Sequence, residues 1–161
     1  EIPYIFHPLE AGIIATRLSL EYGKLDKDIV ASAILHDVCE DAKIGVETLN
    51  LMFNKRITEL VNMQSEDKSK SWKERKQHTI EQLKENEDKA FEIVVLADKL
   101  SNLRAIGRDY LDLGEKVWER FNVKDKSEHA WYYRGILQNI RQLRDTVEYL
   151  EYKQLLEEVF S

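Results

Sequence analysis

The stretch KAFEIVVLADKLSNLRAIGRDYLDLG, residues 89–114, decides the fold of this chain. Its apolar residues recur with helical spacing, and further aliphatic side chains flank the main stripe on both sides. Gly114 then interrupts the pattern. The stretch therefore predicts a long helix from Lys89 to Leu113 whose side chains are interior around nearly its whole circumference.

Helical periodicity also dominates the rest of the chain, and no segment alternates strictly between apolar and polar residues as a half-buried strand does. The 161 residues contain only six Gly and two Pro, too few for the many tight turns of a β-sandwich or barrel. We predict an all-α fold, one helical bundle of about eight helices that spans residues 1–161. Besides 89–113, helices are expected at about 8–22, 27–41, 46–53, 55–63, 72–84, 115–121, 128–145 and 148–159.

Composition excludes several classes of partner. The chain carries 24 Lys and Arg against 30 Asp and Glu, a net charge of −6, so we expect no broad electrostatic binding to nucleic acid. No apolar run approaches the ~20 residues of a membrane span and no signal peptide is visible, so we expect no membrane association. A single cysteine, Cys39, excludes an internal disulfide and fits a cytoplasmic protein. The chain opens on Glu1 rather than Met, and we expect its natural N-terminus to be truncated.

Ionisable residues interrupt an apolar stripe in the second predicted helix. The stripe begins with Ile29 and Ala33 and ends on His36, Asp37 and Glu40. A bundle interior does not accept ionisable groups without partners, because an unpaired buried charge costs several kcal/mol. The pattern therefore indicates a chemical role for the end of this helix.

The long helix repeats this pattern, since its apolar stripe leads to Asp98 and Asn102, one turn apart on one face. The simplest shared partner for a buried histidine and two buried aspartates is a metal ion, and imidazole and carboxylate ligands suit Mn, Fe, Zn or Co. A purely structural interpretation of each residue alone stays open. His36 could be a satisfied core residue, and Asp98 could pair with Lys99 or Arg104.

Three segments together resemble a known family. HPLEAGIIA (7–15), ILHDVCEDA (34–42) and LADKLSNLR (96–104) resemble the signature segments of HD-domain hydrolases, in the right order and over most of the chain. The similarity is greatest to RelA/SpoT-type guanosine polyphosphate (ppGpp) hydrolases, especially their small stand-alone relatives. The resemblance implies an all-helical, metal-dependent phosphohydrolase. Its substrate would be a small nucleotide, ppGpp or pppGpp, whose 3′-pyrophosphate is removed to give GDP or GTP and pyrophosphate.

The resemblance also implies a set of metal ligands. His7, His36, Asp37 and Asp98 match the H…HD…D pattern of the family, whose usual metal is Mn²⁺. A metal held in this way lowers the pKa of a water ligand and stabilises the charge that develops on a phosphoryl group.

Two further carboxylates match the pair that the family uses to position or deprotonate the attacking water. These are Glu40 and Asp41. In a continuous helix they lie one turn beyond His36 and Asp37, so both carboxylates are expected to project towards the metal. One would act as general base and the other as acid or orienting group, in an order that the sequence leaves open.

Candidate substrate contacts surround this set. Asn102 matches a family residue that contacts the ribose or phosphate region, and Tyr4 occupies a position where the family lines its pocket. Arg104 and Arg108 follow Asn102 on the same helix and are candidate phosphate-binding residues. The common Thr three positions after the Asn is Ala105 here, which removes one hydroxyl from the expected nucleotide pocket.

Other functions remain open at this point. The alarmone hydrolases carry a basic segment, H-x-G-Q-x-R-K, just before the first signature, and this sequence does not include it. The same metal centre could therefore act on another nucleotide or on a phosphorylated dinucleotide such as NADPH. A non-catalytic nucleotide-binding module is a further alternative.

Overall fold

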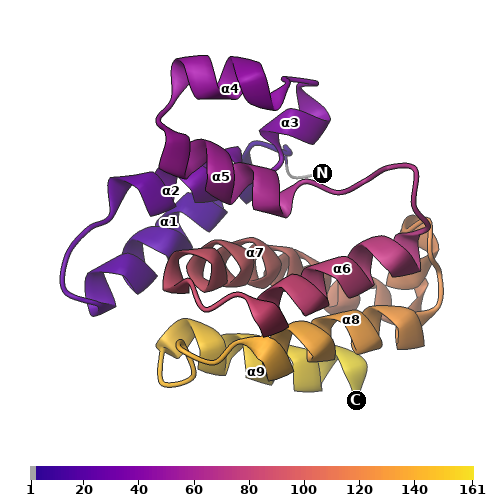
Figure 1. Ribbon diagram of the computed structural model, residues 1–161. Helices are drawn as coiled ribbons and strands as arrows, with labels where there is room; N and C mark the ends of the chain where they lie inside the picture. Colours follow the sequence, from indigo (N-terminus) through magenta and orange to yellow (C-terminus); the bar gives the residue numbers. More distant parts are fainter. Residues whose placement is uncertain (1–2) are drawn as a thin grey trace.

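The computed structural model describes residues 3–161, apart from the side chains of Glu40 and Asp41. Within this part of the chain the regular structure is entirely helical, nine α-helices and one 3-10 helix, which confirms the predicted all-α class (Figure 1). The helices are α1 (Phe6–Glu21), α2 (Lys27–Leu35), α3 (Val38–Asp41), α4 (Val46–Met52), α5 (Lys55–Gln64), α6 (Trp72–Glu85), α7 (Lys89–Leu113), η1 (Gly114–Arg120), α8 (Lys126–Asn139) and α9 (Val147–Phe160).

Helix α7 is the element on which the others pack, and its bounds are those predicted from the sequence. It crosses the middle of the molecule in Figure 1 and contacts α1, α2, α5, α9 and η1. From Ala90 to Leu100 every residue of α7 is buried except Lys99, so the prediction of a helix interior nearly all round is confirmed. Asp98 therefore lies in the core of the bundle.

The prediction of the second helix, at about 27–41, is wrong in one respect that matters for the site. This helix is not continuous to residue 41, because α2 ends at Leu35 and a turn at His36 and Asp37 separates it from α3. The His36 ring uses the carbonyl of Ala33 as acceptor, with Nδ1 and O 2.7 Å apart. In a continuous helix that carbonyl would accept the N–H of Asp37, so the histidine side chain competes with the helix for its own backbone.

Helix α8 is also shorter than predicted. It ends at Asn139 rather than at residue 145, since the following backbone turns under the buried carboxylate of Glu92. That carboxylate accepts hydrogen bonds from the backbone N–H groups of Arg141 and Gln142, at 3.2 and 2.9 Å. Residues 114–120 form a 3-10 helix where an α-helix was expected.

The first two helices approach each other closely at Gly12. A Cβ atom built on Gly12 would lie 2.6 Å from Cγ1 of Ile34, much closer than real Cβ contacts allow. The missing side chain lets α1 lie against α2. This packing brings the start of α1, which carries His7, near the end of α2, which precedes His36.

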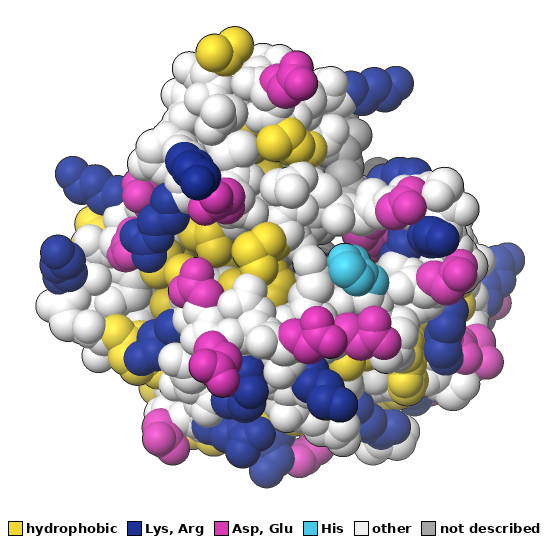
Figure 2. Space-filling view, viewed as in Figure 1, with side chains coloured by type: hydrophobic (Ala, Val, Ile, Leu, Met, Phe, Trp, Pro, Cys, Tyr) yellow, Lys and Arg dark blue, Asp and Glu magenta, His cyan; other side chains and the backbone are white. Residues whose placement is uncertain are grey.

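The surface shown in Figure 2 carries basic and acidic side chains interspersed over the whole face, with patches of apolar side chains between them. Among the described residues, no helix combines the length and the apolar character needed to cross a membrane.

The central role of α7 can be tested with two substitutions of the same type on that helix. Leu96 is fully buried and Leu111 is 87% exposed. We expect Leu96→Ala to lower the free energy of unfolding by about 2–5 kcal/mol, because it leaves a cavity in the core. Leu111→Ala should change it by no more than about 0.5 kcal/mol. Urea unfolding monitored by circular dichroism measures both, and equal losses would contradict the central packing of α7.

Candidate metal centre

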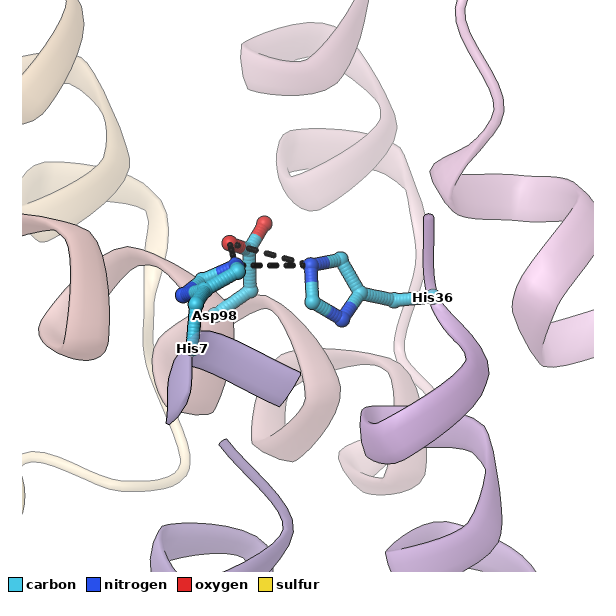
Figure 3. A group of neighbouring side chains, drawn as sticks. All are labelled: His7, His36 and Asp98. Carbon is cyan, nitrogen blue, oxygen red and sulfur yellow. Dashed lines mark hydrogen bonds and ion pairs between the residues drawn. The ribbon is translucent and has the colours of Figure 1, made fainter. Parts of the chain in front are cut away.

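Three side chains from three helical segments converge on one point. His7 comes from the first turn of α1, His36 follows α2 and Asp98 comes from the middle of α7 (Figure 3). The Nε2 atoms of His7 and His36 are 3.1 Å apart. Oδ1 of Asp98 lies 3.3 Å from Nε2 of His7 and 3.4 Å from Nε2 of His36. One candidate ligand atom of each residue lies within 4.8 Å of the others.

Asp37 completes the group from the solvent side. Its Oδ2 lies 3.1 Å from Nε2 of His36 and 4.0 Å from Nε2 of His7, and its side chain is 38% exposed. The structure therefore brings together all four side chains predicted as metal ligands. Asp37 closes the cluster towards solvent, and Asp98 closes it towards the core.

The hydrogen bonds of the two histidines show that the cluster fits a cation. The carbonyl of Ala33 can only accept, so Nδ1 of His36 carries a proton, and it is the lone pair of Nε2 that takes up either a second proton or a metal ion. Nδ1 of His7 lies 2.9 Å from Oγ of Ser101, whose own proton goes to Glu10 at 2.7 Å, so Nε2 of His7 is likewise a lone-pair donor. Two lone pairs that face each other repel unless a positive charge lies between them. Adjacent ligands of one ion with metal–nitrogen bonds of about 2.1 Å are about 3 Å apart, which agrees with the observed geometry.

Asp98 is held by partners on both of its oxygens. Oδ1 faces the histidines and accepts a hydrogen bond from Nδ2 of Asn102 at 2.8 Å, and Oδ2 lies 2.5 Å from Nζ of Lys99. Burial raises the pKa of Asp98, but the charges of Lys99 and His36 outweigh burial and hold that pKa well below its ordinary value. The ion pair with Lys99 that a structural interpretation predicts therefore coexists with the histidine cluster.

The cluster also attracts a proton to His36. Burial lowers the pKa of His36, yet the carboxylates of Asp98 and Asp37 outweigh burial and raise it to about 10. The two carboxylates thus stabilise positive charge at the position where the two Nε2 atoms meet.

A cleft of about 730 Å³ begins at this cluster. Its wall includes His7, Tyr4 and Asn102 near the cluster, and Arg108 further along α7. Tyr4 donates a hydrogen bond from its hydroxyl to Oδ2 of Asp37, 3.2 Å away. Three of the residues predicted to bind substrate thus line the cleft, although their contact with a substrate stays a prediction.

Arg104, the fourth of these, is not among the residues that line the cleft. Its Nε and Nη2 donate to the two oxygens of Glu151, each at 2.6 Å, and Nη1 donates to Glu10 at 3.1 Å. The predicted contact of Arg104 with phosphate stays untested, and two carboxylates already share its charge.

The residues of the cleft that the sequence-based prediction missed include Glu10, Ser101 and Arg120. Glu10 and Ser101 follow the predicted ligands His7 and Asp98 by three residues, a helical spacing that could have identified them. Arg120 lines the far wall and forms an ion pair of 2.5 Å with Asp109. No pattern in the sequence pointed to Arg120.

Glu40 and Asp41 belong to the predicted water-activating pair, and their side chains lie outside the described residues. Their backbone is part of α3, the short helix that follows the turn at His36 and Asp37. The argument that a continuous helix directs them at the metal is wrong, because α2 and α3 are separate helices.

The raised pKa of His36 predicts that metal binding releases a proton. The pKa of His36 in the fold lies above the ordinary value of 6.5, so protonation of His36 stabilises the folded, metal-free protein. This stabilisation is complete below pH 6.5 and is lost as the pH rises to about 10. A metal competes with that proton, so affinity for Mn²⁺ should rise between pH 7 and 9, by up to about tenfold per pH unit. Titration calorimetry in two buffers of different ionisation enthalpy measures the released proton. Equal heats in both buffers would contradict a protonated His36.

Known proteins share both the sequence and the fold of this chain. The family model described as HD domain matches residues 1–122. The guanosine-3′,5′-bis(diphosphate) 3′-pyrophosphohydrolase MESH1 of Mus musculus is 32% identical over 97% of this chain and 80% of its own length. The MESH1 protein of Drosophila melanogaster is 31% identical over 99% of this chain and 80% of its own length.

Two solved structures have the same fold. A protein from Listeria monocytogenes superposes with a TM-score of 0.82 at 28% identity, covering 96% of this chain and 98% of its own. A metazoan ortholog of SpoT, described as hydrolysing ppGpp, superposes with a TM-score of 0.76 at 25% identity, covering 98% of this chain and 82% of its own. The chain therefore belongs to the HD domain family and, within it, is a homologue of the MESH1 and SpoT-like ppGpp hydrolases.

Proposed function

We propose that this protein is a metal-dependent hydrolase that removes the 3′-pyrophosphate of ppGpp or pppGpp. One water is consumed, and GDP or GTP and pyrophosphate are released. The observation that carries the proposal is the His7–His36–Asp98 cluster at one end of a cleft of about 730 Å³, which is in the usual size range of small-molecule sites.

The proposed metal is Mn²⁺, held by His7, His36, Asp37 and Asp98. The paired Nε2 lone pairs and the two carboxylates support a nitrogen- and oxygen-preferring divalent ion. When bound, such an ion would polarise a phosphate oxygen and lower the pKa of water.

The other residues of the site orient these ligands and attract the substrate. Lys99 and Asn102 fix the two oxygens of Asp98, and Tyr4 holds Asp37 at the rim. Arg108 and Arg120 supply positive charge along the cleft wall, where an anionic nucleotide would lie. Of the two arginines predicted on α7, Arg108 is therefore the better substrate contact, since Arg104 would first have to leave a carboxylate partner.

Glu40 and Asp41 are the proposed water-activating pair. The support is their place in α3, directly after the turn that carries His36 and Asp37. We assign this catalysis to one unit, residues 1–161, acting on a small molecule in the cytoplasm; the free thiol of Cys39 supports a reducing compartment.

The first experiment measures pyrophosphate release from ppGpp by the protein with and without Mn²⁺. We expect release only with metal, and its loss in Asp98→Asn, because that change removes one of the two negative charges at the cluster. Asp112→Asn, at another cleft-lining carboxylate, is the matched control and should retain most of the activity. Circular dichroism checks that both variants keep their helical content.

The alternatives give different results in the same experiment. Release of phosphate from NADPH without release of pyrophosphate from ppGpp would retain the metal centre and overturn the substrate. Binding of ppGpp without any turnover, in protein that contains stoichiometric metal, would identify a non-catalytic nucleotide-binding module.

The water-activating step has its own test. Glu40→Gln should leave affinity for Mn²⁺ within about twofold and lower kcat by about 10²–10⁴, the usual contribution of a general base. Metal titration and steady-state kinetics separate the two quantities. A variant with the kcat of the parent would remove Glu40 from the mechanism.

A further inference from the structure

A chain of four side chains runs from the candidate ligand His7 to the last helix of the protein. Nδ1 of His7 contacts Oγ of Ser101 at 2.9 Å, and that hydroxyl donates to Oε2 of Glu10 at 2.7 Å. Oε1 of Glu10 accepts from Nη1 of Arg104 at 3.1 Å, and Arg104 forms a two-point contact with Glu151, with both distances 2.6 Å. Ser101 is 2% exposed, and the three charged side chains are partly buried.

The direction of these hydrogen bonds decides which nitrogen of His7 carries its proton. The hydroxyl of Ser101 has a single proton, and an ionised carboxylate is a much stronger acceptor for it than a neutral imidazole nitrogen. With that proton committed to Glu10, Oγ can only accept from Nδ1 of His7. Nε2 is thereby left without a proton and directed at His36 and Asp98.

Arg104 holds in place the carboxylate of Glu10, which determines the tautomer of His7 through Ser101. Its planar guanidinium is held edge-on by both oxygens of Glu151, so the remaining Nη1 points at Glu10. Glu151 lies on α9, beyond residues 1–122 that match the HD domain. The last helix thus reaches the metal centre through Glu151, which lies outside the three signature segments, whereas Glu10, Ser101 and Arg104 lie within them.

We propose that Ser101, Glu10, Arg104 and Glu151 are positioning residues that orient His7 and fix its tautomer for metal binding, and that α9 is therefore part of the metal centre. The proposal rests on the metal site of the proposed function but not on its substrate. None of the four residues has to touch the nucleotide for this role.

The test measures the dissociation constant of Mn²⁺ for the full chain by titration calorimetry, without any substrate. Ser101→Ala and Glu10→Gln should each weaken binding by about 10–100-fold, the usual cost of losing the partner of a metal-ligating histidine. Glu151→Gln should weaken it less, by several-fold, because it acts through two further residues. The visible absorption of bound Co²⁺ reports the ligand geometry independently and should shift in the first two variants.

Arg17 provides a matched control at the same helix pair. Its Nε lies 3.0 Å from Oε1 of Glu148, so it joins α1 to α9 as Arg104 joins Glu10 to Glu151, but it is not connected to His7. Arg17→Ala should lower the melting temperature and leave the Mn²⁺ dissociation constant within about twofold, within the usual scatter of changes at independent sites. If Arg17→Ala weakened metal binding as much as Glu151→Gln, the effect would be general loosening of α9 and the proposal would be wrong.

A double-mutant cycle makes the test sharper. Because Glu10 acts through the hydroxyl of Ser101, Glu10→Gln should cost little additional affinity in a Ser101→Ala background. Fully additive losses would overturn the proposed chain. So would Mn²⁺ dissociation constants within twofold of the parent in folded Ser101→Ala and Glu10→Gln proteins.

These outcomes are independent of the substrate assignment. Weaker metal binding in the variants of a protein that hydrolyses no ppGpp would support the positioning chain and reject the substrate. Unchanged metal binding in an active ppGpp hydrolase would reject the positioning chain and leave the proposed function intact.

Discussion

The carboxylate of Asp98 is the constraint to which the rest of the site conforms. A negative charge in the core of a bundle is stable only when cations and hydrogen-bond donors surround it. The structure supplies Lys99 at one oxygen, and Asn102 and the two histidines at the other. Helices α1, α2 and α7 must therefore meet at this point, and the close approach of α1 and α2 at Gly12 is part of that meeting.

Much of the fold follows from local rules, and its exceptions come from contacts distant in sequence. The bounds of α7 were predictable because apolar spacing and Gly114 mark them within one stretch of chain. The early end of α8 was not, because the carboxylate that holds the following turn comes from Glu92 on another helix. The break after α2 is intermediate between these cases. His36 could be identified from the sequence as a special residue, but the hydrogen bond between its ring and a backbone carbonyl of its own helix could not be predicted.

The same distinction applies to the site. His7, His36, Asp37 and Asp98 could be predicted because each is a polar residue in a recognisable signature or on an apolar stripe. Helical spacing alone places Glu10 near His7 and Ser101 near Asp98, but nothing in the sequence indicates that Ser101 will contact Glu10 on α1. Arg104 illustrates this limit, because its sequence position suggests phosphate binding and gives no sign of the carboxylates of Glu10 and Glu151 that it contacts in the fold.

The wide separation of the ligands along the chain has a consequence for how the protein is made. His7 and His36 leave the ribosome well before Asp98, and domains form progressively as the chain emerges. Bringing Asp98 next to His7 and His36 closes long chain segments, which costs conformational entropy. The contacts of α7 with α1 and α2 offset this cost, and they form only when α7 docks. Capture of an ion by all four candidate ligands requires Asp98, and therefore comes after synthesis has passed α7 and that helix has docked.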